Sequence, residues 1–337
     1  MTTKNFPQVS RRQLISTLGI GAATAAAFSA AAPVARAGAH AQAKEKSLRG
    51  PYLDLSKPVD NMKAFARLQG DLDTSKTKVG WYKGMVSAVM PDRPLMDLFI
   101  MEGFSVARLI PMENGEGYHK VLREVGFYRE QKFGRAGKIM DTWDNPLTGE
   151  TVRVVPIAND PFNVDLTPFF PPPPDYGGLN ADAPKPKIPF ILPWDPNIYQ
   201  NNVRLDTHIH LYYKSALDPE KWPRESSGEM NRVTESFLYN IDLDDLQDES
   251  QTSTHYNGSW ARVTPWLPWM LMGQAPGHIM YTSFMGTQKS LDDLPRDLIA
   301  AAEKLDPKYL EAPETVYGPS LSSLERYALE QEPAPPL

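Results

Sequence analysis

Apolar and polar residues alternate through the first half of the chain, and this pattern predicts β-strands. Residues 79–90, 95–110 and 118–129 are rich in β-branched and aromatic side chains, with Pro-Asp and Asn-Gly turn sequences between them. Residues 138–144 and 151–157 flank a loop that carries a proline and then a glycine. Because these connections are too short for crossover helices, we expect the strands to be antiparallel neighbours.

The same alternation resumes in the second half of the chain. It predicts four more strands, at residues 203–213, 231–242, 252–264 and 278–285. Helical periodicity with start and stop signals is limited to short segments, at residues 61–68, 295–305 and 321–329. Short connections and few helices disfavour a parallel α/β fold.

These elements predict a mainly β protein, either a single antiparallel β-barrel or a strongly curved sheet, that encloses a ligand cavity. Closure would protect the strand edges, and a barrel of eight or more strands can hold one small ligand. Residues 168–196 interrupt the strands, since ten of these 29 residues are proline. This segment is too aromatic for a solvated linker, so we expect a flap packed on the domain surface.

The amino-terminal segment has the features of an export signal. Arg11 and Arg12 precede residues 14–35, an uncharged stretch of mostly small residues, and Ala-x-Ala cleavage patterns end at Ala37 and Ala41. A membrane-spanning helix needs about 20 strongly apolar residues, which this stretch does not supply. We therefore predict a twin-arginine signal peptide, a periplasmic mature protein and no stable membrane anchor.

We predict a signal peptide at residues 1–41 and a single barrel-like domain at residues 42–337. Composition limits the partners, metal sites and cofactors that this domain could have. The net charge is −6 without a long Lys/Arg run, so we expect no nucleic acid as a partner. The chain has no cysteine, which excludes disulfides, iron–sulfur clusters and thiolate metal sites. It also lacks a phosphate loop, a dinucleotide fingerprint and a nucleophile-elbow serine, and we expect no cofactor.

Five strings in the predicted mature domain are distinctive. They are WYKG at Trp81, REVGFY at residues 123–128, WDNPLTGE at residues 143–150, NDP at Asn159 and FMGTQKSLDDLP at residues 284–295. In order and spacing they resemble the bacterial and fungal family known as domain of unknown function 1838. The resemblance implies a twin-arginine signal, which members often carry, and it assigns no role to any residue.

One predicted strand carries four polar side chains on a single face. Asp206, His208, His210 and Tyr212 alternate with apolar residues, so all four project from the same side. They line the lumen if the apolar face meets an outer layer, and they are solvated if that face meets the core. His-x-His spacing also leaves a divalent metal as an alternative. The glutamate that follows in cupin-like sites is absent from residues 214–218, and we expect no metal.

Glu235 is a second candidate because it interrupts an apolar stripe. It shares a strand face with Val233 and Phe237. A carboxylate buried among apolar side chains holds its proton more tightly, which suits proton transfer near neutral pH. We hypothesise that Glu235 faces one lumen with His208 and His210 and that these three are catalytic. An ion pair with a nearby arginine, or an exposed register, is the structural alternative for Glu235.

Further side chains are candidates for substrate binding. They are Asp206, Tyr212, Arg123, Tyr128, His255 and Trp260. For Arg123 a structural pair with an internal carboxylate is the alternative, and a lone histidine such as His255 is more often structural. If the strand faces are reversed, the search moves to Tyr118, Glu124 and His255.

The sequence therefore predicts a periplasmic enzyme that holds a small apolar, aromatic molecule. It would act by lyase, isomerase or hydrolase chemistry that needs acid/base groups and no organic cofactor. A periplasmic binding protein with the same cavity and no turnover is the alternative. A third interpretation is an interaction module that uses the proline-rich flap and the Trp-rich block at residues 260–272, with a homo-oligomer among the expected partners.

Overall fold

The computed structural model describes residues 49–171, 187–197 and 200–335. The predicted signal peptide at residues 1–41, and residues 172–186 of the predicted flap, lie outside these ranges. Within them, the helices are all too short or too polar to cross a lipid bilayer.

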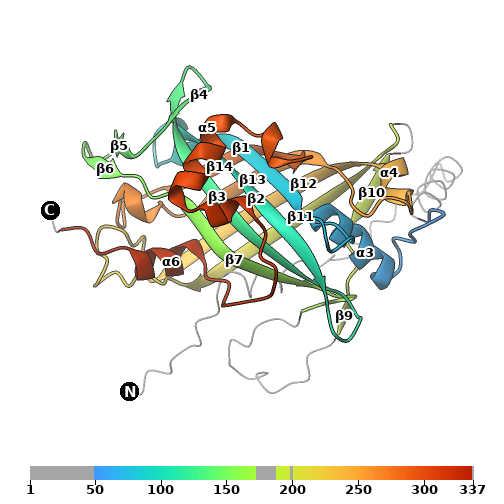
Figure 1. Cartoon of the computed structure of the whole chain (residues 1–337). Coiled ribbons are helices and arrows are strands. Elements are labelled where there is room, and N and C mark those ends of the chain that lie inside the picture. Colours follow the sequence, from blue (N-terminus) through green and yellow to red (C-terminus); the bar gives the residue numbers. More distant parts are fainter. Residues whose placement is uncertain (1–48, 172–186, 198–199, 336–337) are drawn as a thin grey trace, which may run out of the picture.

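Ten antiparallel strands form one large sheet, which confirms the predicted mainly β, antiparallel fold (Figure 1). Their order is β10-β11-β12-β13-β14-β1-β2-β3-β4, and β7 also pairs with β3. The strands are β1 (Lys78–Val89), β2 (Met96–Pro111), β3 (Tyr118–Lys132), β4 (Arg135–Ile139), β7 (Ile157–Leu166), β10 (Trp194–Asn197), β11 (Asn202–Lys214), β12 (Met230–Asp242), β13 (Asn257–Thr264) and β14 (His278–Gln288). Two small sheets pair β5 (Thr142–Asp144) with β6 (Thr151–Arg153) and β8 (Phe169–Phe170) with β9 (Ile188–Pro189).

The pairing of β14 with β1 joins the two halves of the chain. Its register runs without a shift from Val79 opposite Gln288 to Val89 opposite His278. Most other strand pairs are neighbours in sequence, as short connections require. Because side chains alternate along each strand, this shared register gives the sheet two continuous faces across both halves.

The sheet does not close into a barrel within the described ranges, since β10 at one end pairs with neither β4 nor β7 at the other. Residues 167–193, which follow β7, are rich in proline. Proline has no N–H to donate to a ladder, and the described strands of this connection, β8 and β9, pair with each other rather than with the large sheet. Closure of the ladder is therefore a part of the fold prediction that is not observed.

Helix α3 (Pro58–Gln69) packs against one end of the sheet. Its Met62 is buried with Leu205 of β11 and with the described ends of the proline-rich segment. The side-chain oxygen of buried Asn61 accepts hydrogen bonds from Leu192 N and Trp194 Nε1, both at 2.9 Å. Helix α3 thus fixes the described ends of that segment to the domain.

A second helical layer covers the outer face of β1 to β3 (Figure 1). There α5 (Arg296–Leu305) and the 3-10 helix η3 (Pro307–Leu310) bury Leu298 and Tyr309 in a cluster with strand residues such as Phe104. We call the opposite face of the sheet the inner face. The outer face of β11 to β14 carries exposed side chains, including Phe284, which is 76% exposed.

The other helices are short. They are α4 (Leu243–Gln247), α6 (Ser323–Glu330) and the 3-10 helices η1 (Pro268–Met270) and η2 (Leu291–Asp293). A capping box begins α6: Ser322 Oγ accepts from Glu325 N at 3.2 Å, and the Glu325 carboxylate accepts from Ser322 N at 2.6 Å. The three helices expected from the sequence are thus present as α3, α5 and α6.

Two tryptophans of the Trp-rich block belong to the core. Trp266 and Trp269 are buried in a cluster with Phe99, Tyr128 and Trp143. The ring centroids of Phe99 and Trp269 are 5.4 Å apart. Because both side chains are buried, neither tryptophan is available to contact a partner protein. These two residues therefore do not support the interpretation as an interaction module.

Candidate functional site

A cavity of about 350 Å³ opens on the inner face of the sheet. Residues from β3 and β7 line it together with residues from β11 and β12, which stand on the other half of the ladder, and α3 contributes as well. Aromatic rings form much of the wall, among them Phe65, Tyr82, Phe237, Tyr239, Tyr256 and Trp260. This volume and lining are typical of sites for small organic molecules.

The wall rings pack against one another. The ring centroid of Trp260 lies 6.1 Å from that of Tyr82 and 6.3 Å from that of Phe237, and Tyr239 meets Tyr256 edge-on at 4.9 Å. Burial raises the pKa of Tyr256 to about 12 and raises the pKa of Tyr239 further. Both phenols are therefore uncharged at neutral pH.

Glu235 lies in this wall, as the sequence predicted for a carboxylate in an apolar stripe. It is 5% exposed and accepts a hydrogen bond from Trp260 Nε1 at 3.0 Å. The Arg262 Nε atom stands 3.9 Å from Glu235 Oε1, so the alternative of an arginine partner is also observed. The structure thus brings together three predicted site residues in one cavity lining, Glu235, Trp260 and His208.

A second set of polar side chains lies on the inner face of β3. Lys120 Nζ donates to Gln69 Oε1 of α3 at 2.6 Å, and Glu124 Oε2 accepts from Asn159 Nδ2 of β7 at 2.6 Å. Burial lowers the pKa of Lys120 to about 8, and the charge of Glu124 opposes that shift. The cavity therefore holds an ammonium that can release its proton near neutral pH, and a carboxylate lies on the same strand face.

Tyr82 crosses the middle of the sheet toward Glu124. It pairs with Gly103, which pairs in turn with Gly126, and a Cβ atom at Gly126 would lie 2.7 Å from the Tyr82 hydroxyl oxygen. The two glycines thus make room for this ring. Burial, with the charge of Glu124, raises the pKa of Tyr82 well above its ordinary value, which keeps the phenol protonated.

The predicted grouping of His208, His210 and Glu235 is seen only in part, because His208 and Glu235 both border the large cavity and His210 is not in its lining. Both histidines are exposed, on the outer face of β11, and they lie opposite Ser236 and Thr234 of β12. The residue opposite Glu235 is Ile209, whose side chain projects away from the histidines. The apolar face of β11 meets the core, so the polar face is the solvated one.

The other two members of the polar quartet share that outer face. His208 Nε2 lies 3.4 Å from Asp206 Oδ1, and Tyr212 is 59% exposed, with the Arg232 guanidinium 5.7 Å from its ring centroid. Asp206 and Tyr212, like His210, are not among the residues that line the cavity. Among the described residues no three His, Asp or Glu side chains are grouped closely enough to hold a metal ion.

Arg123 serves as a structural tie. Its Nε lies 3.0 Å from Asp160 Oδ1, and its other nitrogens donate to the carbonyls of Lys308 and Glu311 and to Tyr317. These contacts hold the segment after α5 against β3 and β7. The structure thus matches the structural alternative for Arg123, because odd-numbered residues of β3 face outward.

His255 also lies apart from the cavity lining. It is exposed, and its Nδ1 is 3.0 Å from Thr287 Oγ1. Partial burial and the positive charge of Lys78 lower the pKa of His255. A neutral ring bonded to a threonine is the structural use expected of a lone histidine.

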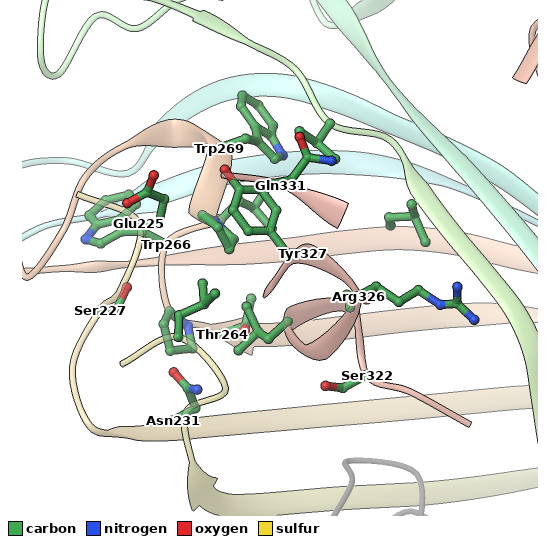
Figure 2. Close-up of a pocket in the computed structure, with 18 of the residues that line it drawn as sticks. Glu225, Ser227, Asn231, Thr264, Trp266, Trp269, Ser322, Arg326, Tyr327 and Gln331 are labelled. Carbon is green, nitrogen blue, oxygen red and sulfur yellow. The ribbon is translucent and has the colours of Figure 1, made fainter. Parts of the chain in front are cut away.

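Tyr128 lines a smaller pocket of about 90 Å³ that adjoins the large cavity, with Arg262 and Asn159 in the walls of both. Figure 2 shows Tyr327 and Gln331 beside Trp269 in this pocket. Burial raises the pKa of Tyr327 to about 12. The large cavity therefore continues into a narrower space under α6.

Polar atoms are concentrated in the smaller pocket. Asn231 Nδ2, Ser227 Oγ and Glu225 Oε2 line it, buried and without a hydrogen-bond partner among the described residues (Figure 2). The other oxygen of Glu225, Oε1, accepts from Ala334 N at 2.6 Å. The smaller pocket thus combines aromatic walls with three buried polar atoms that have no partner among the described residues.

Comparison with protein-family models gives a match over most of the chain. The family model described as "Protein of unknown function (DUF1838)" covers residues 75–329. The chain belongs to the DUF1838 family. The search of curated proteins returned no match. In this DUF1838 chain the matched region begins just before β1, so the α3 residues Phe65 and Gln69 line the cavity from outside it.

The sequence did not identify several polar residues that line this DUF1838 cavity. Lys120, Tyr82, Asn159 and Arg262 were not predicted there, although Glu124 was reserved for the case of reversed faces. A signal existed, because Lys120 and Glu124 alternate on one face of a predicted strand and Tyr82 and Asn159 lie in the WYKG and NDP strings. Strand alternation alone does not say which face is inward.

Proposed function

We propose that this protein is an enzyme that holds a small apolar, aromatic molecule in the large cavity and acts on it by acid/base chemistry. The observation that carries the proposal is the cavity of about 350 Å³, whose aromatic walls surround a few converging polar groups, Lys120, Glu124 and Glu235. A site with apolar walls selects an aromatic body, and the polar groups select and polarise its functional group.

Proton transfer in this proposal uses the residues of β3 and β1. Glu124, oriented by Asn159, accepts a proton from the bound molecule, while Lys120 or the phenol of Tyr82 donates one. Glu235, held by Trp260 and Arg262, stabilises charge elsewhere in the wall. Lyase, isomerase and hydrolase reactions all use such a donor and acceptor pair.

The proposal includes an enclosed site and a periplasmic location. Side chains from both halves of the ladder line the same cavity, which supports a barrel-like enclosure although the hydrogen-bonded ladder is open. Arg11 and Arg12, followed by a small-residue stretch, support export by the twin-arginine route to the periplasm.

Exchange of carbon-bound hydrogen tests the proposed chemistry without knowledge of the natural substrate. Phenylacetone fits an aromatic cavity of this size and carries acidic hydrogens beside its carbonyl. We expect the protein to accelerate their exchange with deuterium in D₂O, measured by proton NMR. Glu124→Gln should lower the exchange rate by roughly 10²- to 10⁴-fold, whereas the exposed Glu113→Gln control should leave it unchanged.

A binding protein without turnover is the second candidate, favoured by the dominance of apolar over polar wall residues. It predicts quenching of tryptophan fluorescence by 2-methylnaphthalene, lost in Trp260→Phe, with no hydrogen exchange above buffer. Exchange that survives Glu124→Gln would instead refute the assigned proton acceptor.

A further inference from the structure

Among the described residues, Lys78 is buried and Lys120 is half-buried in the cavity wall, and their surroundings differ. Lys78 donates to three acceptors, Arg67 O at 2.6 Å, Thr254 O at 2.7 Å and Ser253 Oγ at 2.9 Å. An ammonium has three N–H donors, so all of them are used. Lys78 is therefore a structural tie between α3 and the segment before β13.

Lys120 stands in the cavity wall with one hydrogen bond among the described residues, to Gln69 Oε1. Its neighbours in the wall include Leu122, Val164 and Tyr239. Two of its N–H groups are thus available to a bound molecule. An amine with unused N–H groups in an aromatic cavity can act as a nucleophile as well as a proton donor.

We propose that Lys120 forms a reversible imine with the aldehyde or ketone group of a small aromatic ligand. This inference rests on the proposed function, since it places the ligand in the same cavity. The neutral amine attacks the carbonyl carbon, and as the carbon–nitrogen bond forms one proton passes from the nitrogen to the carbonyl oxygen. The nitrogen then gives up its second proton to the hydroxyl, which leaves as water and gives the C=N bond.

We assign these proton transfers to Glu124, whose charge acts on Lys120. It lies on the same strand face as Lys120, and Asn159 Nδ2 fixes one of its oxygens. The carboxylate accepts the proton released from nitrogen and returns it to the departing hydroxyl. The net reaction consumes one carbonyl and one amine and releases one water, so no oxidant or reductant is needed.

The fraction of neutral amine alone would favour Lys78 over Lys120 as the nucleophile. Burial lowers the pKa of Lys78 to about 7 and that of Lys120 to about 8. At pH 7 about half of Lys78 and about a tenth of Lys120 would be neutral, against about one in 2,500 for an exposed lysine. Geometry reverses this order, because Lys78 is fully hydrogen-bonded and only Lys120 lines the cavity.

Reductive trapping of the full chain distinguishes the two lysines. The protein is incubated at pH 7 with 2-naphthaldehyde and sodium cyanoborohydride, and adducts are located by peptide mass spectrometry. We expect Lys120 to be modified about 250-fold faster than exposed lysines, from the ratio of free-amine fractions. Lys78 should remain unmodified, and 2-methylnaphthalene should compete with the reaction at Lys120.

Lys120→Met and Lys120→Arg should abolish the fast adduct while keeping the circular dichroism spectrum. The adduct positions in the wild-type protein test the proposal even if neither variant folds, because they compare lysines within one protein. Binding of 2-methylnaphthalene without preferential modification of Lys120 overturns the imine and leaves the proposed cavity function standing. Failure of 2-methylnaphthalene to bind overturns both, and faster modification of Lys78 overturns the geometric argument.

Discussion

At the scale of single residues, the inner face of the sheet depends on space as much as on polarity. Tyr82 reaches Glu124 because Gly103 and Gly126 have no side chains in its path. The same ring forms the cavity wall beside Trp260. Two positions without side chains thus allow one phenol to take part in the proposed site.

Gly126→Ala should disturb this arrangement. The added methyl group would lie 2.7 Å from the Tyr82 hydroxyl oxygen, so the ring or the strand must shift. We expect a loss of about 1–3 kcal/mol in the free energy of unfolding, measured by urea denaturation. Tyr82→Phe removes that oxygen, so Gly126→Ala should cost less when it is combined with Tyr82→Phe than when it is made alone. An equal cost with and without Tyr82→Phe would contradict the proposed steric cause.

At the scale of elements, α3 connects three parts of the molecule. Its Asn61 binds the residues before β10, its Gln69 binds Lys120 of β3, and its apolar side chains pack on β11. One short helix therefore positions both the proline-rich segment and the lysine of the cavity.

Asn61→Ala should release the described end of that segment. The substitution leaves Leu192 N and Trp194 Nε1 without their acceptor, at a cost of about 1–3 kcal/mol for each buried donor that finds no other. We expect a lower free energy of unfolding and faster limited proteolysis within residues 187–194. Asn114→Ala, in an exposed turn, is the matched control and should change stability by less than about 0.5 kcal/mol. Unchanged proteolysis of Asn61→Ala would show that apolar packing alone holds the segment.

At the scale of the whole molecule, the β1–β14 ladder makes one site from two halves of the chain. Lys120 and Glu124 come from the first half, and Glu235 and Trp260 from the second, yet all four line one cavity. Because the site combines residues that are far apart in sequence, it exists only once the chain has folded. This is compatible with an export route that carries folded proteins.

Export by that route predicts a defined mature protein. We expect the periplasmic form to begin after Ala37 or Ala41, as measured by intact mass. A double Arg11→Lys, Arg12→Lys variant should accumulate in the cytoplasm. Retention of the full amino terminus, or normal export of the double variant, would contradict the twin-arginine prediction.

The sequence by itself determined the elements. Alternation over residues 79–90 and 118–129 predicted strands that the structure places at Lys78–Val89 and Tyr118–Lys132, and short connections predicted that they are antiparallel. Local chemistry fixes these features, since backbone geometry and turn residues act over a few positions. Glu235 was found in the same way, as a carboxylate within an apolar stripe.

Only the tertiary structure decided which face of each strand is inward. In β11 the alternation separates Leu205 and Leu211 from His208 and His210, but either face could have met a core. The packing of Leu205 with α3 settles the matter, and it sends the histidines to solvent and Lys120 of β3 into the cavity. The physical reason is that a period of two defines two faces without ranking them, and only contacts between residues distant in sequence bury one of them.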